Sequence, residues 1–173
     1  MIGLDKQHNL KLRALEPEDL DFLYTIENDE DLWEVGNTNV PYSKYAISNY
    51  LLTTQNDIYA DKQLRLVLED DSNKPVGLID LFNFSPSHLR ADIGIAVVAD
   101  VRNMGYGKEA VEWLVRYSKN VLHLHQLCAW VGAHNAYSLK LFHNAGFEQG
   151  ARLKDWVFDG KHFDDVIVMQ LFL

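Results

Sequence analysis

The sequence has few of the features that mark exported, membrane-spanning or nucleic-acid-binding proteins. Its 173 residues include one cysteine, Cys128, so no disulfide can form within the chain. No apolar run approaches the roughly 20 residues that a helix needs to cross a bilayer. No charged and then apolar leader opens the chain. We therefore expect a cytoplasmic protein with no membrane partner.

Basic residues are scarce relative to acidic ones. The chain has 16 Lys and Arg against 25 Asp and Glu, a formal net charge of −9 at pH 7. This balance argues against the phosphate backbone of nucleic acid as a partner and is compatible with a cationic one. No repeat, linker or low-complexity tract is evident, and 47% of the residues are hydrophobic. We expect a single domain over residues 1–173.

Residue periodicity predicts alternating strands and helices. Helices are expected from Pro17 to Glu27, from a Ser43 cap to Thr54, and from an Asn135 cap to a stop at Gly146. Another helix follows the glycines of residues 102–107. Strands are expected at 10–14, 64–69, 76–84, 92–98, 127–131, 147–153, 156–158 and 166–172, with an Asp159-Gly160 hairpin turn. The strands at 64–69, 76–84 and 92–98 should form an antiparallel set.

The central stretch, residues 90–117, combines a strand, a glycine-containing loop and a helix. Its loop reads Arg102-Asn103-Met104-Gly105-Tyr106-Gly107. The first amides of a helix have no partner within it, and two glycines leave them unobstructed, so they can close around an anion such as a pyrophosphate. The alternative is that Gly105 and Gly107 only make a tight strand-to-helix turn.

A second block, NAYSLKLFHNAGF at residues 135–147, resembles the second signature of the GCN5-related N-acetyltransferases. The block at 102–107 resembles the acyl-CoA pyrophosphate loop of that superfamily, and the order of strands agrees from Leu10 to the end. The resemblance implies an α/β acyltransferase fold, with a mixed, mostly antiparallel sheet and helices on both faces. It also implies acetyl-CoA in a central cleft as the acyl donor. We expect no metal, because His123 and His125, which could share one face of a strand, have no nearby carboxylate or thiol to complete a site.

Two further pieces resemble subgroups of the superfamily. FDGKHFDD, residues 158–165, looks like the closing hairpin of spermidine or diamine N-acetyltransferases and of ribosomal-protein N-terminal acetyltransferases. RADIGI, residues 90–95, looks like their Arg-Ala-Glu strand with Asp92 in place of Glu. These pieces imply a primary amine as acceptor, either a polyamine such as spermidine or the N-terminus of a peptide.

The choice between these acceptors is left open. The acidic residues of segment 27–34 either form a wall that receives a cation or are a solvated loop. The stretch Asn39-Val40-Pro41 lacks the glutamates that spermidine acetyltransferases tend to carry there. Whether the chain forms a homo-oligomer is also left open, although relatives often associate through sheet edges or closing strands.

The resemblance implies where acetyl-CoA is held. The pantetheine arm would lie like an extra strand against the backbone around Ile95, Ala96 and Val97. Amides from Arg102 to Lys108 would hold the pyrophosphate, and Asn135, with Ser138 nearby, would bind the pantetheine. The predicted set is Ile95, Ala96, Val97, Arg102, Asn103, Met104, Gly105, Tyr106, Gly107, Lys108, Asn135 and Ser138.

Asp92 is the candidate catalytic base. A lysine-like amine has a pKa near 10.4, so only about one molecule in a few thousand is unprotonated at pH 7 and a proton must leave before attack. The alternatives are that Asp92 binds the substrate cation or simply faces solvent. A backbone amide near Val97 is expected to donate to the oxygen that becomes negative during transfer.

Phe142 occupies the position where many members of the superfamily place a Tyr that protonates the departing thiolate. A thiol with a pKa near 8.5 is a tolerable leaving group, so turnover can survive the change. Tyr137 is an alternative acid, and Tyr106 is expected to cover the cofactor. Phe142 also favours two rival hypotheses, which are a non-catalytic acyl-CoA-binding module and an enzyme with a bulkier acyl donor.

Overall fold

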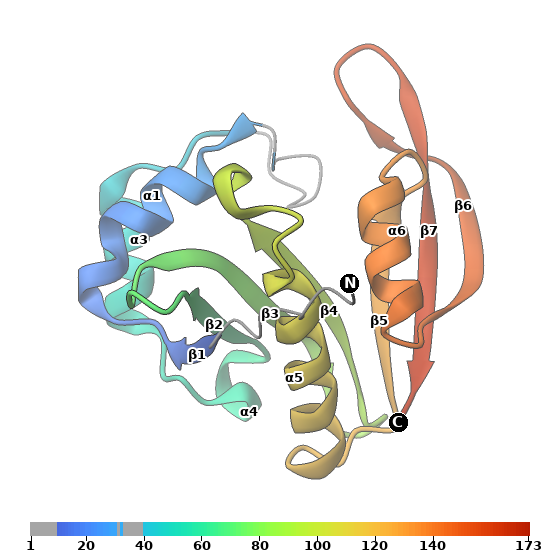
Figure 1. Cartoon of the computed structure of the whole chain (residues 1–173), viewed down its shortest axis with the longest axis horizontal. Coiled ribbons are helices and arrows are strands. Elements are labelled where there is room, and N and C mark those ends of the chain that lie inside the picture. The colour runs from blue at the N-terminus through green and yellow to red at the C-terminus, as the bar shows by residue number, and fades with distance from the viewer. Residues whose placement is uncertain (1–9, 31, 33–39) are drawn as a thin grey trace, which may run out of the picture.

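The computed structural model describes residues 10–30, 32 and 40–173. In these ranges the strands form one seven-stranded sheet with the order β1-β2-β3-β4-β5-β7-β6 (Figure 1). Every neighbouring pair is antiparallel except β4 and β5, which confirms a mixed, mostly antiparallel sheet. The strands are β1 (Lys11–Ala14), β2 (Leu64–Glu69), β3 (Pro75–Ser85), β4 (Arg90–Val97), β5 (Gln126–Gly132), β6 (Glu148–Phe158) and β7 (Phe163–Phe172).

Two helices begin at the caps that the sequence predicts, whereas the segment expected as a helix from Pro17 opens with a 3-10 turn, Pro17–Asp19, and becomes α-helical at Leu20. The Ser43 hydroxyl accepts the Ala46 amide at 3.1 Å, and the Asn135 side chain accepts the Ser138 amide at 3.0 Å. Gly146, with φ of +93°, follows the end of the last helix. The described helices are α1 (Leu20–Glu27), α3 (Lys44–Thr53), α4 (Ile58–Asp61), α5 (Tyr106–Asn120) and α6 (Ala136–Asn144). Helix α4 was not predicted, because four residues are too few for helical periodicity to appear.

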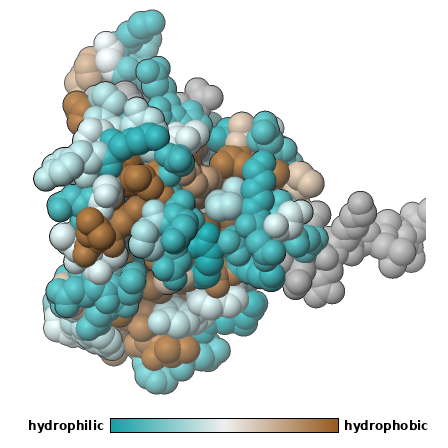
Figure 2. All heavy atoms as spheres, turned by 90° about the vertical axis from the view of Figure 1, so that its left-hand side faces the viewer, coloured by the Kyte–Doolittle hydropathy of each residue, from teal (hydrophilic) through white to brown (hydrophobic). Residues whose placement is uncertain are grey.

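Two hydrophobic clusters lie on the two faces of the sheet. One cluster includes Leu114 of α5 and Phe147, both fully buried, and the other includes Leu23 of α1 and Ile47 of α3. Figure 1 shows α1 and α3 on one side of the sheet and α5 in front of it. This arrangement confirms the helices on both faces. On the side of α1 and α3, hydrophobic residues form separate patches among hydrophilic ones (Figure 2).

The closing hairpin departs from the sequence prediction in one respect. Residues 147–153 and 156–158 were expected as two strands, but β6 is continuous from Glu148 to Phe158. Its register against β7 shifts between Leu153 and Val157. Such an irregularity interrupts the alternation on which a strand prediction depends. The turn prediction is confirmed, since Gly160 has φ of +96° and the Asp159 carboxylate accepts the Lys161 amide.

A cluster of largely buried charges joins α1 to the sheet. The Arg65 guanidinium of β2 donates to Asp80 of β3 at 2.8 and 3.0 Å and to Glu27 at the end of α1 at 2.5 Å. All three side chains are about four-fifths buried. The ring of Tyr50 on α3 lies 5.9 Å from the guanidinium carbon. This cluster fixes the end of α1 against the strands that lead to the centre of the sheet.

Replacing Arg65 with Met should destabilise the fold strongly. The substitution leaves two carboxylates without their cation, and removing one partner of a buried ion pair costs roughly 3–5 kcal/mol. Lys44→Met is the matched control, because Lys44 pairs with Asp21 on the exposed surface and such pairs contribute little. Urea unfolding measures both variants, and equal stability of the two would contradict this interpretation of the cluster.

Candidate active site

The site is organised around the place where β4 and β5 separate. Their parallel pairing covers three residue pairs, from Arg90 opposite Gln126 to Asp92 opposite Cys128. On the other side, β4 stays paired with β3 as far as Val97. Figure 1 shows β4 and β5 close together at the start of each strand and diverging along their length. After Asp92, β4 is therefore bonded to a described strand on its β3 side only.

The backbone of β4 presents alternate residues to this opening. Val98 donates its amide to Val76 at 3.0 Å, so Val98 faces β3. The Ala96 carbonyl also faces β3, because a Cβ added to Gly77 would lie 2.5 Å from it. Alternation then turns the amides and carbonyls of Ile95 and Val97 toward the opening. The sequence prediction placed Ala96 with Ile95 and Val97 against the pantetheine arm. In the structure the backbone groups of Ala96 face β3 and not the opening.

The loop at 102–107 has the conformation of a helix entry that requires glycine. Gly105 has φ of +99° and precedes α5, whose first internal bond runs from the Glu109 amide to the Gly105 carbonyl at 3.2 Å. The amides before Glu109 therefore point out of the helix end. Gly107 faces Leu141 of α6, and an added Cβ would make an ordinary van der Waals contact with it at 3.6 Å. The requirement for glycine in this loop therefore rests on Gly105.

The remaining loop residues lie on the surface around this helix end. Asn103 has φ of +64°, and Met104 and Lys108 are exposed. The Arg102 side chain turns back and donates to the Val97 carbonyl at 3.0 Å. This bond ties the loop to the end of β4 and uses one of the backbone groups that face the opening.

The aromatic residues considered for the acid and for covering the cofactor differ in burial. Phe142 is 4% exposed and packs edge-to-face on Phe147 at 5.1 Å, while Tyr137 is 77% exposed. Tyr106 is buried in the core, and burial raises the pKa of its hydroxyl. Asn135 and Ser138 lie together at the start of α6, joined by the capping bond.

Asp92 is half-buried and belongs to the last residue pair before β4 and β5 separate. Burial raises the pKa of its carboxyl above the ordinary value. Hydrogen bonds from the Asn83 amide, at 2.9 Å, and from the Trp130 indole oppose this shift, as does the charge of Arg90. The neighbouring Cys128 thiol has a raised pKa because of burial and the charge of Asp92. The raised pKa makes Asp92 a stronger base than an exposed aspartate.

Asn83 and Trp130 are the residues near Asp92 that the sequence did not single out. Asn83 has φ of +49° at an irregularity in the β3–β4 register. Trp130 lies on β5, two residues beyond the partner of Asp92. Only the register of three strands brings these side chains together, so no local pattern could have identified them.

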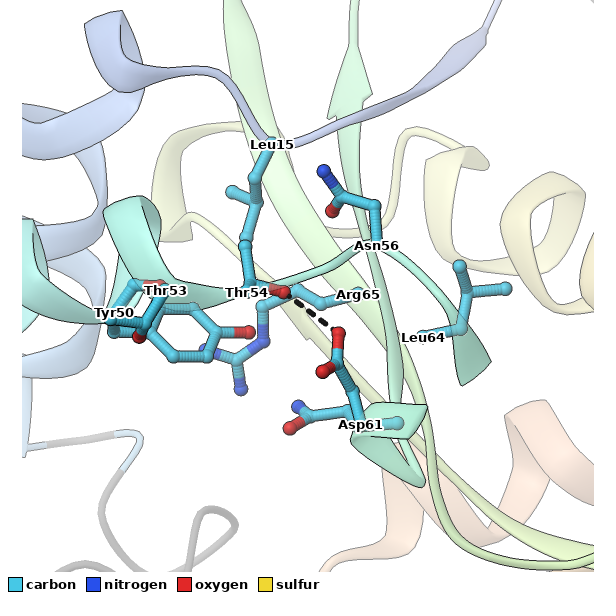
Figure 3. A pocket seen from close by; sticks show the side chains of 9 residues that line it. Leu15, Tyr50, Thr53, Thr54, Asn56, Asp61, Leu64 and Arg65 are labelled. Carbon is cyan, nitrogen blue, oxygen red and sulfur yellow. Dashed lines mark hydrogen bonds between the residues drawn. The ribbon is translucent and has the colours of Figure 1, made fainter. Parts of the chain in front are cut away.

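A shallow pocket of about 200 Å³ lies elsewhere, between α3, α4 and the start of β2. Figure 3 shows Tyr50, Arg65 and Asp61 around it, with the Thr54 hydroxyl donating to Asp61 at 3.1 Å. None of the residues predicted to bind acetyl-CoA lines it. The pocket is separate from the β4–β5 opening.

The acidic segment is only partly within the described residues. Glu27 forms an ion pair with Arg65, so it belongs neither to a wall that receives a cation nor to a solvated loop. Asp31 and Glu34 lie outside the described residues. Among the described residues, no group of three His, Cys, Asp or Glu could hold a metal. In the same ranges, none of the helices has the length and apolar character needed to cross a membrane.

Comparison with known proteins gives consistent matches. The family model described as "Acetyltransferase (GNAT) domain" matches residues 9–148. The chain is 25% identical to the spermidine N(1)-acetyltransferase of Vibrio cholerae over 156 residues, covering 90% of this chain and 88% of that protein. It is 26% identical to the enzyme of that name from Escherichia coli K12 over 165 residues, covering 95% and 87%.

A solved structure of spermidine N-acetyltransferase from Vibrio cholerae, in complex with CoA and spermine, superposes with a TM-score of 0.86. The sequence identity is 24%, and the match covers 94% of this chain and 95% of the solved one. At this identity, the superposition establishes that the two proteins share a fold.

Replacing Asn83 with Gly should raise the pKa of Asp92 further. Glycine tolerates the positive φ, so the change removes mainly the donor that stabilises the carboxylate. Asn73→Gly is the control, since Asn73 has φ of +59° and bonds Lys11 instead. Carbon-detected NMR titration of the Asp92 carboxyl measures the shift. An unchanged or lower pKa in the Asn83 variant would contradict the assignment.

Proposed function

The chain belongs to the GNAT acetyltransferase family and is an acetyl-CoA-dependent N-acetyltransferase, and from this premise we propose that its acceptor is a polyamine such as spermidine. The observation that carries the proposal is a half-buried carboxylate, Asp92, at the mouth of the β4–β5 opening. The net charge of −9 and the names of the two bacterial relatives support a cationic acceptor. A peptide N-terminus is the alternative acceptor.

The opening suits the donor. Acetyl-CoA supplies an acetyl group activated as a thioester. Its pantetheine arm carries amides, and the Ile95 backbone groups and the Val97 amide, which face the opening, can pair with them as a strand edge does. The Val97 carbonyl already accepts from Arg102. The outward amides of α5, after Gly105, suit a pyrophosphate because the N-terminal end of a helix is positive. Asn135 lies at the start of α6, where we place it beside the arm.

Asp92 would remove the proton that blocks attack by the amine. The acceptor ammonium must be deprotonated first, and a carboxylate of raised pKa is better matched to this transfer than an ordinary one. The Val97 amide would donate to the oxygen that becomes negative when nitrogen attacks the acetyl carbon. The Asp92 carboxylate and the Val97 amide lie on one strand, which fixes the direction from which the amine approaches the acetyl carbon.

Phe142 cannot supply a proton to the departing sulfur. Its ring is buried against Phe147, so its contribution is to packing. The thiolate can leave without help because its pKa is near 8.5. We propose that turnover proceeds without a side-chain acid at this position.

We also infer that residues 1–173 act as a single domain. The support is that β1, near the start of the described residues, and β6 and β7, at the end, belong to one sheet. Self-association and the cellular location stay predictions.

Replacing Gly105 with Ala should weaken acetyl-CoA binding. A Cβ at φ of +99° is strained, with a cost of roughly 1–2 kcal/mol, so the loop and the amides that follow it should move. Gly160→Ala is the control, since Gly160 has φ of +96° with nothing near its added Cβ. Calorimetry measures the affinity. A loss of affinity in the control equal to that in the Gly105 variant would contradict the assignment of the loop.

The acceptor proposal is tested by thiol release from acetyl-CoA. The panel contains spermidine, a short diamine and a peptide with a free N-terminus, with enzyme alone as the blank. We expect spermidine to give the largest stimulation. Asp92→Asn should lower kcat/KM by about 10²–10⁴-fold, as loss of a general base does, and should leave acetyl-CoA affinity unchanged.

Asp100→Asn is the matched control, since Asp100 is an exposed carboxylate just beyond β4. Stimulation by the peptide alone would replace the polyamine with a protein N-terminus. A flat panel with acetyl-CoA bound would contradict the proposal, and rescue by Phe142→Tyr would then identify the missing acid as the cause.

A further inference from the structure

We propose that Trp130 positions Asp92 and, together with Trp156, forms the aromatic wall that recognises the cationic chain of the acceptor. This inference rests on the proposed function and adds two residues that neither signature block contains. It follows from the register of the sheet, the contacts of the two indoles and the chemistry of the carboxylate beside them.

The register places Trp130 on the same face of the sheet as Asp92. Asp92 lies opposite Cys128, and residues directly opposite each other in a sheet project to one side. Cys128 and Trp130 are two apart on β5 and share that side. The intervening Ala129 is fully buried on the other side, in the cluster beneath α5 and α6. Trp130 therefore stands at the edge of the opening, one step beyond the carboxylate.

Two side chains on opposite strands adjoin the Asp92 carboxylate. The Asn83 side-chain amide donates from β3 at 2.9 Å, and the indole of Trp130 on β5 is the second group whose hydrogen bonding lowers the pKa of the carboxyl. A carboxylate held on both sides keeps a fixed direction, which a base that acts on one bound amine requires. The charged or titratable groups facing it are Arg90 on its own strand and the Cys128 thiol on β5.

The Trp130 ring is itself held by a second indole. Trp156 of β6 stacks on it with 6.2 Å between the ring centroids and 27° between the planes. The two side chains remain 44% and 58% exposed. Burial in a core therefore does not account for the pair, and the stack presents a fixed aromatic surface to solvent beside Asp92.

A third ring borders the carboxylate from the other side. Phe82 lies opposite Asp92 on β3, and its ring passes over Gly94, where an added Cβ would be 3.3 Å from it. Asp92 thus has an aromatic residue on each neighbouring strand. Because residue 94 is glycine, no side chain occupies the space that the Phe82 ring covers.

This combination suits a protonated amine on an aliphatic chain. The carboxylate attracts the ammonium, and indole faces attract cations, with about 0.5–1 kcal/mol at an exposed site. The same faces cover methylene groups well. A chain with several ammonium groups can bind one at Asp92 and lay the next along the Trp130 and Trp156 stack.

The test separates the indole N–H from the ring by two substitutions. Trp130→Phe keeps a ring and loses the donor, so the acidic limb of the kcat/KM profile should move to higher pH while KM for spermidine stays within about 2-fold. Trp130→Leu loses both, so KM should also rise about 2–5-fold, the factor expected for an exposed cation–π contact. Trp156→Leu should raise KM without moving the limb.

Trp113→Phe is the control, because Trp113 stacks on Tyr117 of α5, away from the opening. An unmoved acidic limb in Trp130→Phe together with an unchanged KM in Trp130→Leu would overturn the inference and leave the proposed function standing. If no acceptor stimulates the unmodified protein, the proposed function fails. The Asp92 titration by NMR and the calorimetric affinity for spermidine in the same variants then decide the inference without turnover.

Discussion

The limited pairing between β4 and β5 is the constraint on which the site depends. Parallel strands normally continue side by side, but these two separate after Asp92 while β4 stays bonded to β3. Half of the backbone groups in the last part of β4 then face an opening. The same strand carries the Asp92 carboxylate. The backbone groups proposed to hold the acyl donor and the base proposed to act on the acceptor amine therefore lie on one rigid element, as a precise site requires.

Packing on both faces keeps β4 in place despite its missing neighbour. Ile93 and Ile95 belong to the cluster beneath α5, and Ala96 packs with the cluster beneath α1 and α3. The close approach of Gly77 to the Ala96 carbonyl admits no side chain. The Arg65 cluster anchors α1 to β2 and β3. The strand is therefore fixed by its surroundings and does not need a second partner along its full length.

Much of this arrangement could be predicted from local sequence. Ser43, Asn135 and Gly105 each meet a backbone requirement that leaves a sign in the sequence, and the alternation in β4 separates Ile95 and Val97 from Ala96 on the two faces. The contacts of Asp92 could not be predicted, because Asn83 and Trp130 reach it through the register of three strands. The pairing of Glu27 with Arg65 was hidden for the same reason, since 38 residues separate them.

The central claim is that alternate amides of β4 face the opening and receive the acyl donor. Amide hydrogen exchange at single-residue resolution, with and without acetyl-CoA, tests it most directly. The amides of Ile95 and Val97 should gain protection when acetyl-CoA binds, while those of Gly94 and Ala96, bonded to β3, should change little. Bound acetyl-CoA with no change at Ile95 and Val97, or with equal changes at all four positions, would contradict the account.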